Sequence, residues 1–338
     1  MVLQTSSFNT ARPNTVQHAV IVDGDGGGDE LQLLGVLLAS DKVKVIAGTS
    51  CFGNVGQHQV FQNMRDITHF LNQDKIPIYP GASCDSDGTP TEEDGAHGSN
   101  GLGGVTLPHS HAPKRTKDAV DYILQTLKNR PAQSVSITAS GPLTNIAKAI
   151  NQDPETMARV KDIIIMGGCL KDMKAVDMPT RRGNITKNAE FNFFNAPQDA
   201  KKVLQSGLPI TLLPMDCTHQ LTFGPEQKAI IQAAKIPENK KKPLLTLLGA
   251  SEAMDLRKFN IPGVMHDVHC ALYLLDPSQY ETRTSAVNVN TDDNQNIRGR
   301  TDYTDDSSIP KITVGENVKD PARLFNTVKE SFETIFKA

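Results

Sequence analysis

The chain of 338 residues has few of the features that mark nucleic-acid-binding, disulfide-rich or membrane proteins. Its formal net charge is −3, so it lacks the basic excess expected of a protein that binds nucleic acid. Its five cysteines are widely spaced and form no C-x-x-C pair, which favours reduced thiols in a cytoplasmic protein over a disulfide framework or zinc site. No apolar run is long enough to span a bilayer, so we expect no membrane partner.

The first residues also lack the apolar segment of a secretory signal. Residues 1–17 are rich in Ser, Thr, Asn and Gln, which predicts a flexible N-terminal lead-in. Residues 18–338 contain no internal repeat and no clear linker. We therefore expect them to form a single domain.

Short apolar runs alternate with helical patterns along most of the chain. This alternation predicts an α/β fold with a doubly wound, largely parallel sheet flanked by helices. Thr116 is the expected N-cap of one helix and Pro142 the expected first residue of the next. Two further helices are expected at residues 244–257 and 265–275, and a long loop at residues 167–195. The expected strands are residues 19–22, 42–47, 76–79, 134–139, 162–166, 209–213, 285–290, 297–301 and 311–314.

A crowded acidic turn follows the first expected strand. Asp23, Asp25, Asp29 and Glu30 lie within eight residues, where four like charges repel one another unless a cation or a proton compensates. The turn is not a phosphate-binding loop, because the third glycine of a G-x-G-x-x-G fingerprint falls on Asp29 and no Gly-Lys-Ser/Thr follows. It also departs from a calcium-binding EF-hand loop, whose third ligand position is occupied by Gly27.

A hard divalent cation such as Ca²⁺ nevertheless suits these oxygen ligands. Helix capping by Asp29, with Glu30 in the first helical turn, would explain those two acids without a metal. It would not explain Asp23 and Asp25. The pattern therefore favours a metal site over capping alone.

Other polar residues follow other strands, and the carboxyl ends of parallel strands meet at one edge of a sheet. Residues 48–56, 139–142 and 167–195 each follow an expected strand, so we expect their side chains to converge with the acidic turn. Asp267, at the start of a helix, is a further candidate ligand, and the adjacent His266 a candidate acid; capping by Asp267 beside a packed histidine is the alternative. The polar residues expected to converge are Asn54, Ser140, Asn184, Glu190 and Asn192.

These pieces together fit one known pattern. The chain resembles the nucleoside hydrolases, the inosine–uridine-preferring ribohydrolase family, whose first motif D-x-D-P-G-x-D-D reads D-G-D-G-G-G-D-E at residues 23–30. The resemblance spans roughly residues 18–332. Further matches follow in family order at residues 53–55, 78–81, 97–104, 140–147, 166–168, 183–184, 189–192, 215–218 and 265–267.

The resemblance implies tightly bound Ca²⁺ and hydrolysis of the N-glycosidic bond of ribonucleosides to free base and ribose, by a homodimer or homotetramer. Asp25 would be a metal ligand and the general base, with Glu30, Asp267 and the backbone carbonyl of Ser140 as further ligands. His266 would assist the leaving base, which favours inosine–uridine or pyrimidine types of substrate over purine-specific ones. The implied ribose-binding residues are Asp29, Asn54, Asn184, Glu190 and Asn192, with Met166 lining the sugar pocket and His97 and Phe191 near the base.

The acidic turn also departs from the family motif. Glu30 stands where the family has aspartate, and its extra methylene moves the carboxylate by about 1.5 Å, so the ion or the helix start must shift. Gly26 replaces the proline, which either loosens the turn or lets its backbone move to accommodate Glu30. Residues 169–183 form a longer loop than the family usually has, which could cover the site or contact another subunit.

Two other functions stay open at this point. One is a nucleoside- or ribose-binding protein of the same fold, in which Glu30 has weakened or abolished catalysis. The other is a Ca²⁺-dependent enzyme that acts on another N-glycoside, such as a nicotinamide riboside.

Overall fold

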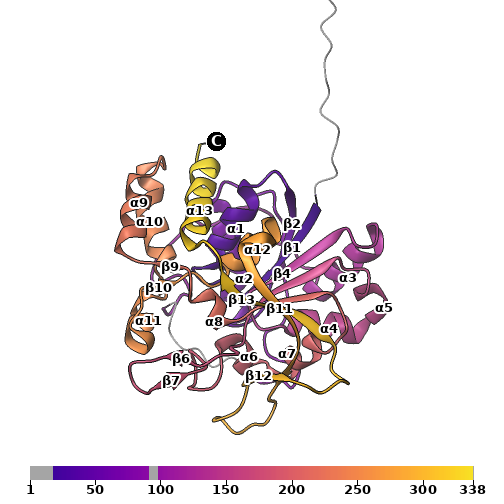
Figure 1. The fold of residues 1–338 in the computed structure, drawn as a ribbon. Coiled ribbons are helices and arrows are strands. Elements are labelled where there is room, and N and C mark those ends of the chain that lie inside the picture. The colour runs from indigo at the N-terminus through magenta and orange to yellow at the C-terminus, as the bar shows by residue number, and fades with distance from the viewer. Residues whose placement is uncertain (1–17, 91–97, 338) are drawn as a thin grey trace, which may run out of the picture.

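A computed structural model of the protein describes residues 18–90 and 98–337, and a nine-stranded sheet forms its centre (Figure 1). The strands of this sheet, in spatial order, are β12 (Thr301–Thr304), β11 (Tyr280–Val289), β13 (Lys311–Val318), β8 (Ile210–Leu213), β5 (Asp162–Met166), β4 (Val135–Ala139), β1 (His18–Gly24), β2 (Val43–Ser50) and β3 (Ile78–Pro80). All neighbours from β13 to β3 are parallel, and only β11 runs antiparallel to its neighbours β12 and β13. The expected doubly wound, largely parallel sheet is confirmed.

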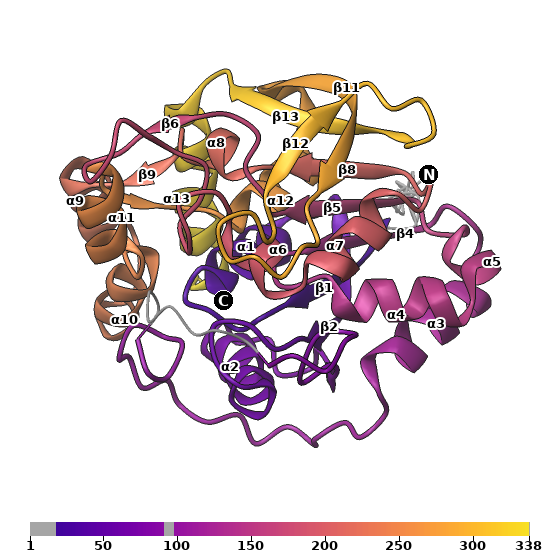
Figure 2. The same ribbon diagram turned by 90° about the horizontal axis from the view of Figure 1, so that it is seen from below.

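Helices cover both faces of this sheet (Figure 2). The helices are α1 (Glu30–Ala39), α2 (Gln57–Phe70), α3 (Ala119–Asn129), α4 (Thr144–Gln152), α5 (Pro154–Met157), α6 (Phe191–Asn195), α7 (Pro197–Leu204), α8 (Met215–Thr218), α9 (Pro225–Ala233), α10 (Glu238–Leu248), α11 (Glu252–Phe259), α12 (Val268–Leu275), the 3₁₀ turn η1 (Pro277–Gln279) and α13 (Pro321–Ile335). Two small antiparallel pairs lie outside the main sheet: β6 (Met173–Lys174) with β7 (Thr180–Arg181), and β9 (Thr222–Phe223) with β10 (Gly263–Val264).

The interior strand β1, between β4 and β2, shows why both faces must be covered. Val20 and Val22 point into a core shared with α1, α12 and α13, whereas Ala19 and Ile21 point into a second core shared with α3, α4 and α7. Successive side chains of a strand point to opposite faces, so a fully apolar strand needs a helical layer on each side.

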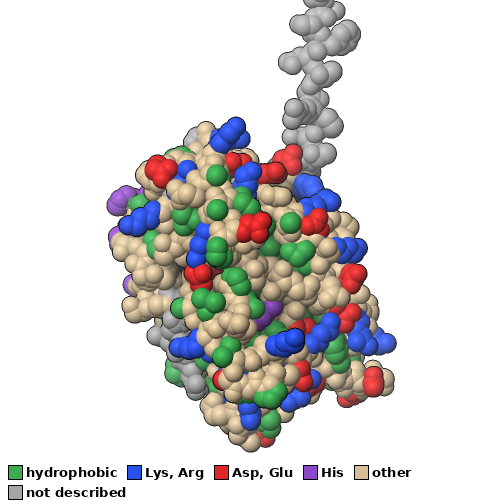
Figure 3. Space-filling model, turned by 60° about the vertical axis from the view of Figure 1, so that its left-hand side comes forward, with side chains coloured by type: hydrophobic (Ala, Val, Ile, Leu, Met, Phe, Trp, Pro, Cys, Tyr) green, Lys and Arg blue, Asp and Glu red, His purple; other side chains and the backbone are tan. Residues whose placement is uncertain are grey.

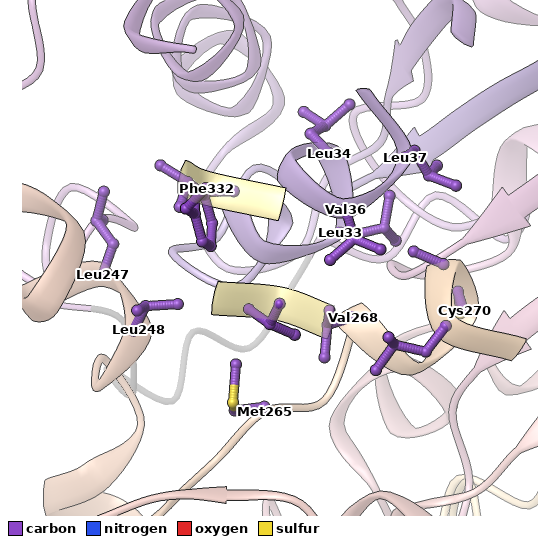
Figure 4. Packing of buried hydrophobic residues seen from close by; sticks show 14 of the residues in the cluster. Leu33, Leu34, Val36, Leu37, Leu247, Leu248, Met265, Val268, Cys270 and Phe332 are labelled. Carbon is purple, nitrogen blue, oxygen red and sulfur yellow. The ribbon is translucent and has the colours of Figure 1, made fainter. Parts of the chain in front are cut away.

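Helix α1 is buried almost throughout and starts directly after the acidic turn. Leu33 and Leu37 pack in the core shown in Figure 4, near Val268 of α12. Gly35 allows α13 to come close, because a Cβ at this position would lie only 2.6 Å from Cε1 of Phe332. The start of α1, and with it the acidic turn, is therefore anchored by dense packing.

Several expected boundaries were wrong. Thr116 is not a cap: α3 starts at Ala119, and the carboxylate of Asp118 accepts the Val120 amide at 2.8 Å. Pro142 is not the first helical residue, since α4 starts two residues later, after a turn. Aspartate is a stronger N-cap than threonine, and the earlier start was placed by pattern alone.

The chain segments beyond the sheet centre also differ from expectation. The single helix expected at 244–257 is the pair α10 and α11, and the helix expected at 265–275 starts only at Val268. The long loop expected at 167–195 contains β6, β7 and α6, while the strands expected at 285–290 and 297–301 are β11 and β12, each shifted. β11 starts five residues earlier than expected, because its first half pairs with β13. This half is exposed and shows no apolar alternation, so the sequence pattern does not indicate a strand there.

The surface is mixed in charge. On the face shown in Figure 3, lysine and arginine side chains are interspersed with aspartate and glutamate. Within residues 18–90 and 98–337, no helix is long and apolar enough to cross a membrane.

Candidate active site

The loops that follow β1, β2, β4 and β5 meet around one cavity. The cavity is lined by Asp25, Asp29, Asn54, Ser140, Met166, Asn184, Glu190, Phe191, Asn192, Ser251, Met254, His266 and Asp267. The structure thus brings together the site residues expected from the sequence, with Glu30 just behind this lining, next to Asp25 and Asp267. His97 lies outside the described residues.

Asp25 is held at the floor of the cavity by Asn54. The Asn54 side-chain amide donates to Oδ1 at 2.8 Å and its backbone amide to Oδ2 at 3.3 Å. Asp23 lies deeper and accepts hydrogen bonds from Thr49 at 2.5 Å and from the amide of Asn145 at 2.8 Å. Asp23 therefore ties the turn to β2 and α4, whereas Asp25 faces the ligand space.

Two acids occupy helix starts without capping them. Asp29 immediately precedes α1 and Asp267 immediately precedes α12, yet neither side chain accepts a capping hydrogen bond from its own helix. Both residues instead line the cavity. The capping alternative for these residues was therefore wrong. The positive ends of two helix dipoles point toward the acidic cluster and partly offset its charge.

Three carboxylates form the deepest part of the site. Asp25, Glu30 and Asp267 are buried, and one carboxylate oxygen of each lies within 4.8 Å of the others. Burial, followed by repulsion from Asp29, raises the pKa of Glu30 to about 8. The same causes raise the pKa values of Asp25 and Asp267 well above their usual range.

Such a cluster fits a hard divalent cation. Ionisation of three buried carboxyl groups this close together is unfavourable, and a cation bound between them removes that cost. Hard divalent cations also prefer carboxylate oxygens as ligands. The Ser140 backbone carbonyl, the expected fourth ligand, lies in the same cavity wall and accepts the Asn192 side-chain amide at 3.1 Å. The donor set is thus compatible with the metal that the sequence predicts.

The glycines of the turn are buried and tightly packed. Gly26 has φ of +64°, a conformation that proline, fixed near −65°, cannot adopt, so the turn differs here from a proline-containing motif. The Asn63 side chain donates to the Gly26 carbonyl at 3.0 Å, and a Cβ at Gly28 would lie 3.0 Å from the Ala250 methyl. Neighbouring side chains therefore fix the turn from both sides.

The second wall of the cavity is built by residues 184–195. Glu190 caps α6: its carboxylate accepts the amides of Asn192 at 2.8 Å, Phe193 at 3.2 Å and Gly168 at 2.7 Å. The Asn184 side-chain oxygen accepts the Phe191 amide at 2.9 Å. This segment is a cap and a short helix, and its carboxylate and amide side chains line the cavity.

His266 also lines the cavity and is buried. Its Nδ1 lies 2.7 Å from the Thr218 hydroxyl. Ring nitrogens of His219 and His266 and a carboxylate oxygen of Asp255 lie within 4.8 Å of one another. Burial lowers the pKa of His219 to about 4, so the His219 ring is neutral at pH 7. No local motif indicates His219 or Asp255, because three separate segments bring these residues and His266 together.

Two more lining residues were not anticipated. Met254 of α11 and Ser251, the residue before this helix, line the cavity. The hairpin of β6 and β7 docks on this helix: the Val176 amide donates to the Lys258 carbonyl at 2.9 Å, and the Lys258 ammonium contacts the Asn184 carbonyl. The long loop therefore braces a wall of the cavity, and its contact with another subunit stays a prediction.

The comparisons with known proteins agree with this geometry. The model of the inosine–uridine preferring nucleoside hydrolase family matches residues 20–326. A pyrimidine-specific ribonucleoside hydrolase of Salmonella enteritidis is 31% identical over 282 residues, which cover 80% of this chain and 84% of that protein. An uncharacterized protein of Schizosaccharomyces pombe is 31% identical over 273 residues, with the same two coverages.

Solved structures show the same fold. A plant nucleoside hydrolase superposes with a TM-score of 0.83 at 26% identity, covering 94% of this chain and 99% of that one. A purine-preferring ribonucleoside hydrolase from Gardnerella vaginalis superposes with a TM-score of 0.82 at 24% identity, with the same coverages. The chain thus belongs to the inosine–uridine preferring nucleoside hydrolase family and is an enzyme of the ribonucleoside hydrolase type.

Proposed function

We propose that the protein is a Ca²⁺-dependent hydrolase that cleaves ribonucleosides to free base and ribose. One observation supports this most strongly: a buried cluster of Asp25, Glu30 and Asp267 lies beside a cavity lined with amide and carboxylate groups. In the proposal these three carboxylates and the Ser140 carbonyl hold the ion. The chemistry that Ca²⁺ supplies when bound is orientation of ribose hydroxyls and water, and easier deprotonation of that water.

The ribose is proposed to bind between the two walls of the cavity. Its hydroxyls would donate hydrogen bonds to the carboxylates of Asp29 and Glu190. They would exchange hydrogen bonds with the side-chain amides of Asn54, Asn184 and Asn192, with Met166 against the sugar ring. As the bond to the base breaks, positive charge develops on the ribose. The buried carboxylates around the sugar stabilise that charge more strongly than water would.

Proton transfers then fall to two residues. Asp25 accepts a proton from the attacking water, because its carboxylate lines the cavity beside the proposed ion. His266 supports departure of the nucleobase, and Phe191 lies near that nucleobase. The position of His266 and the pyrimidine-specific name of the Salmonella relative support pyrimidine or inosine–uridine substrates.

The test is release of reducing sugar from inosine, uridine, cytidine and adenosine, before and after treatment with chelator and after addition of Ca²⁺. Loss of the general base costs about 10²- to 10⁴-fold, so Asp25→Asn should lower kcat by at least that factor. Asp305→Asn, at an exposed acid after β12, is the control and should leave turnover unchanged. Absence of turnover on all four nucleosides with Ca²⁺ present would refute the proposal.

Glu30 motivates a second candidate, a protein that binds nucleoside or ribose with little or no catalysis. Calorimetry separates the two. Binding without hydrolysis, unchanged in Glu30→Asp, supports a binding protein. Activity that rises in Glu30→Asp supports an enzyme that the longer side chain has slowed.

The substrate panel and the state of assembly extend the proposal. Nicotinamide riboside added to the same assay tests whether another N-glycoside is the preferred substrate. A homodimer or homotetramer is proposed from the family, and sedimentation of the purified protein measures it directly.

A further inference from the structure

Glu30 carries one methylene more than the family aspartate, so its longer side chain has to be accommodated somewhere. Its carboxylate folds back over the end of β1 and lies against Gly24. A Cβ at position 24 would lie 2.8 Å from Oε1 of Glu30 and closer still to Cδ and Oε2. The carboxylate therefore occupies the volume that any side chain at position 24 would need.

The backbone of Gly24 gives no other reason for glycine. Gly24 is the last residue of β1, pairs with Ser50 of β2, and accepts the Cys51 amide at 2.8 Å. Gly24 does not have a left-handed φ. Any L-residue could adopt this extended conformation, so space for the Glu30 carboxylate remains as the reason.

The carboxylate of Glu30 is also held on its other sides. The Ser140 hydroxyl lies 3.3 Å from Oε2 and 3.5 Å from Oε1, and a backbone hydrogen bond comes from Gly26. Glu30 is completely buried. It cannot swing away from position 24 without leaving these donors and the two aspartates of the cluster.

We infer that Gly24 and Glu30 form a matched pair: the missing side chain at position 24 lets the longer Glu30 place its carboxylate in the cation site. Gly24 is thus a positioning residue that acts through Glu30. This inference rests on the proposed cation site. With this pairing, neither the ion nor the helix start has to shift. The longer side chain of Glu30 is accommodated at Gly24, outside the three consecutive glycines 26–28.

The pair predicts a specific coupling. In Gly24→Ala, the new methyl pushes the Glu30 carboxylate by more than about 1 Å, beyond the tolerance of about 0.5 Å for a preorganised site. Aspartate at position 30 reaches about 1.5 Å less far and leaves room for the methyl. The same Gly24→Ala substitution should therefore do little harm when combined with Glu30→Asp.

The experiment is a cycle of four proteins: wild type, Gly24→Ala, Glu30→Asp and the double variant. Ca²⁺ affinity is measured by calorimetry after chelation, and melting temperature with and without Ca²⁺. Gly24→Ala should weaken Ca²⁺ binding at least tenfold beside Glu30 and less than threefold beside Asp at position 30. Gly56→Ala is the control, because Gly56 has no atom within 4 Å of its Cβ position and an ordinary φ of −56°.

Equal effects of Gly24→Ala in both backgrounds would overturn the inference. If Gly24→Ala fails to fold, a folded double variant supports the pairing, and an unfolded double variant beside a folded Glu30→Asp overturns it. If wild type binds no Ca²⁺, the cation proposal fails. The melting-temperature cycle in chelator then decides on the pair alone, because the clash is present without a metal.

Discussion

The raised pKa values of the acidic cluster predict that the stability of the protein depends on pH without a bound cation and loses this dependence when a cation is bound. Burial raises the pKa of Glu30 to about 8 and that of Asp23 to about 6. A carboxyl group whose pKa is higher in the folded than in the unfolded state stabilises the fold as pH falls through the folded value. In chelator, the protein should therefore become more stable as pH is lowered from 9 to 6.

The size of this effect follows from linkage. For Glu30 alone, the change between pH 9 and pH 6 is about 3 kcal/mol. A chain of this length has an unfolding entropy near 0.7 kcal/mol per degree, so the melting temperature should rise by about 4 °C. The other buried acids act in the same direction and add to this value.

A cation should abolish this rise. In the proposed function Ca²⁺ binds the ionised carboxylates of the folded state, so at pH 9 it should remove the penalty that the bare cluster carries. Melting temperatures are measured from pH 6 to 9 in chelator and in millimolar Ca²⁺. The stabilisation by Ca²⁺ should be largest at pH 9 and smallest at pH 6.

Two variants assign the effect to the cluster. Glu30→Gln removes one ionisable group and should flatten the pH dependence in chelator, whereas the exposed control Asp305→Asn should leave it unchanged. Identical pH profiles with chelator and with Ca²⁺, or an unaltered profile in Glu30→Gln, would refute the reasoning.

Two further predictions concern the surroundings of the site. Burial lowers the pKa of His219 from 6.5 to about 4, so stability should fall as pH drops from 6.5 to 4, by on the order of 3 kcal/mol; His219→Phe should remove this loss in urea unfolding, and the exposed control His58→Gln should not. Gly35→Ala should destabilise by about 1–3 kcal/mol, because its methyl would meet the Phe332 ring. Adding Phe332→Leu should recover part of that loss, and no recovery in urea unfolding would contradict the proposed contact.

Much of the fold followed from local pattern. The apolar run of β1 predicted a strand buried on both faces, and the alternation of strands and helices predicted the doubly wound sheet. Helix starts and the extents of the outer strands were less predictable. Asp118 rather than Thr116 caps α3, because aspartate is the stronger of these two capping residues.

The candidate site followed from topology more than from any one motif. Because β1, β2, β4 and β5 are parallel, the residues after them had to meet at one edge, as Asp25, Asn54 and Ser140 do. His219, Ser251 and Met254 escaped prediction, since no spacing in the sequence links them to that edge. They reach the cavity region through α11 and the segment after α8.

By itself, the sequence determined that four acids follow a buried strand and that such a concentration of charge requires compensation. Only the tertiary structure decided how each acid is used. An acid at a helix start can cap it or face a ligand, and the packing of α1 and α12 turns Asp29 and Asp267 toward the cavity. The structure likewise shows that Glu30 fits because Gly24 has no side chain, since steric fit depends on distances that the order of residues does not contain.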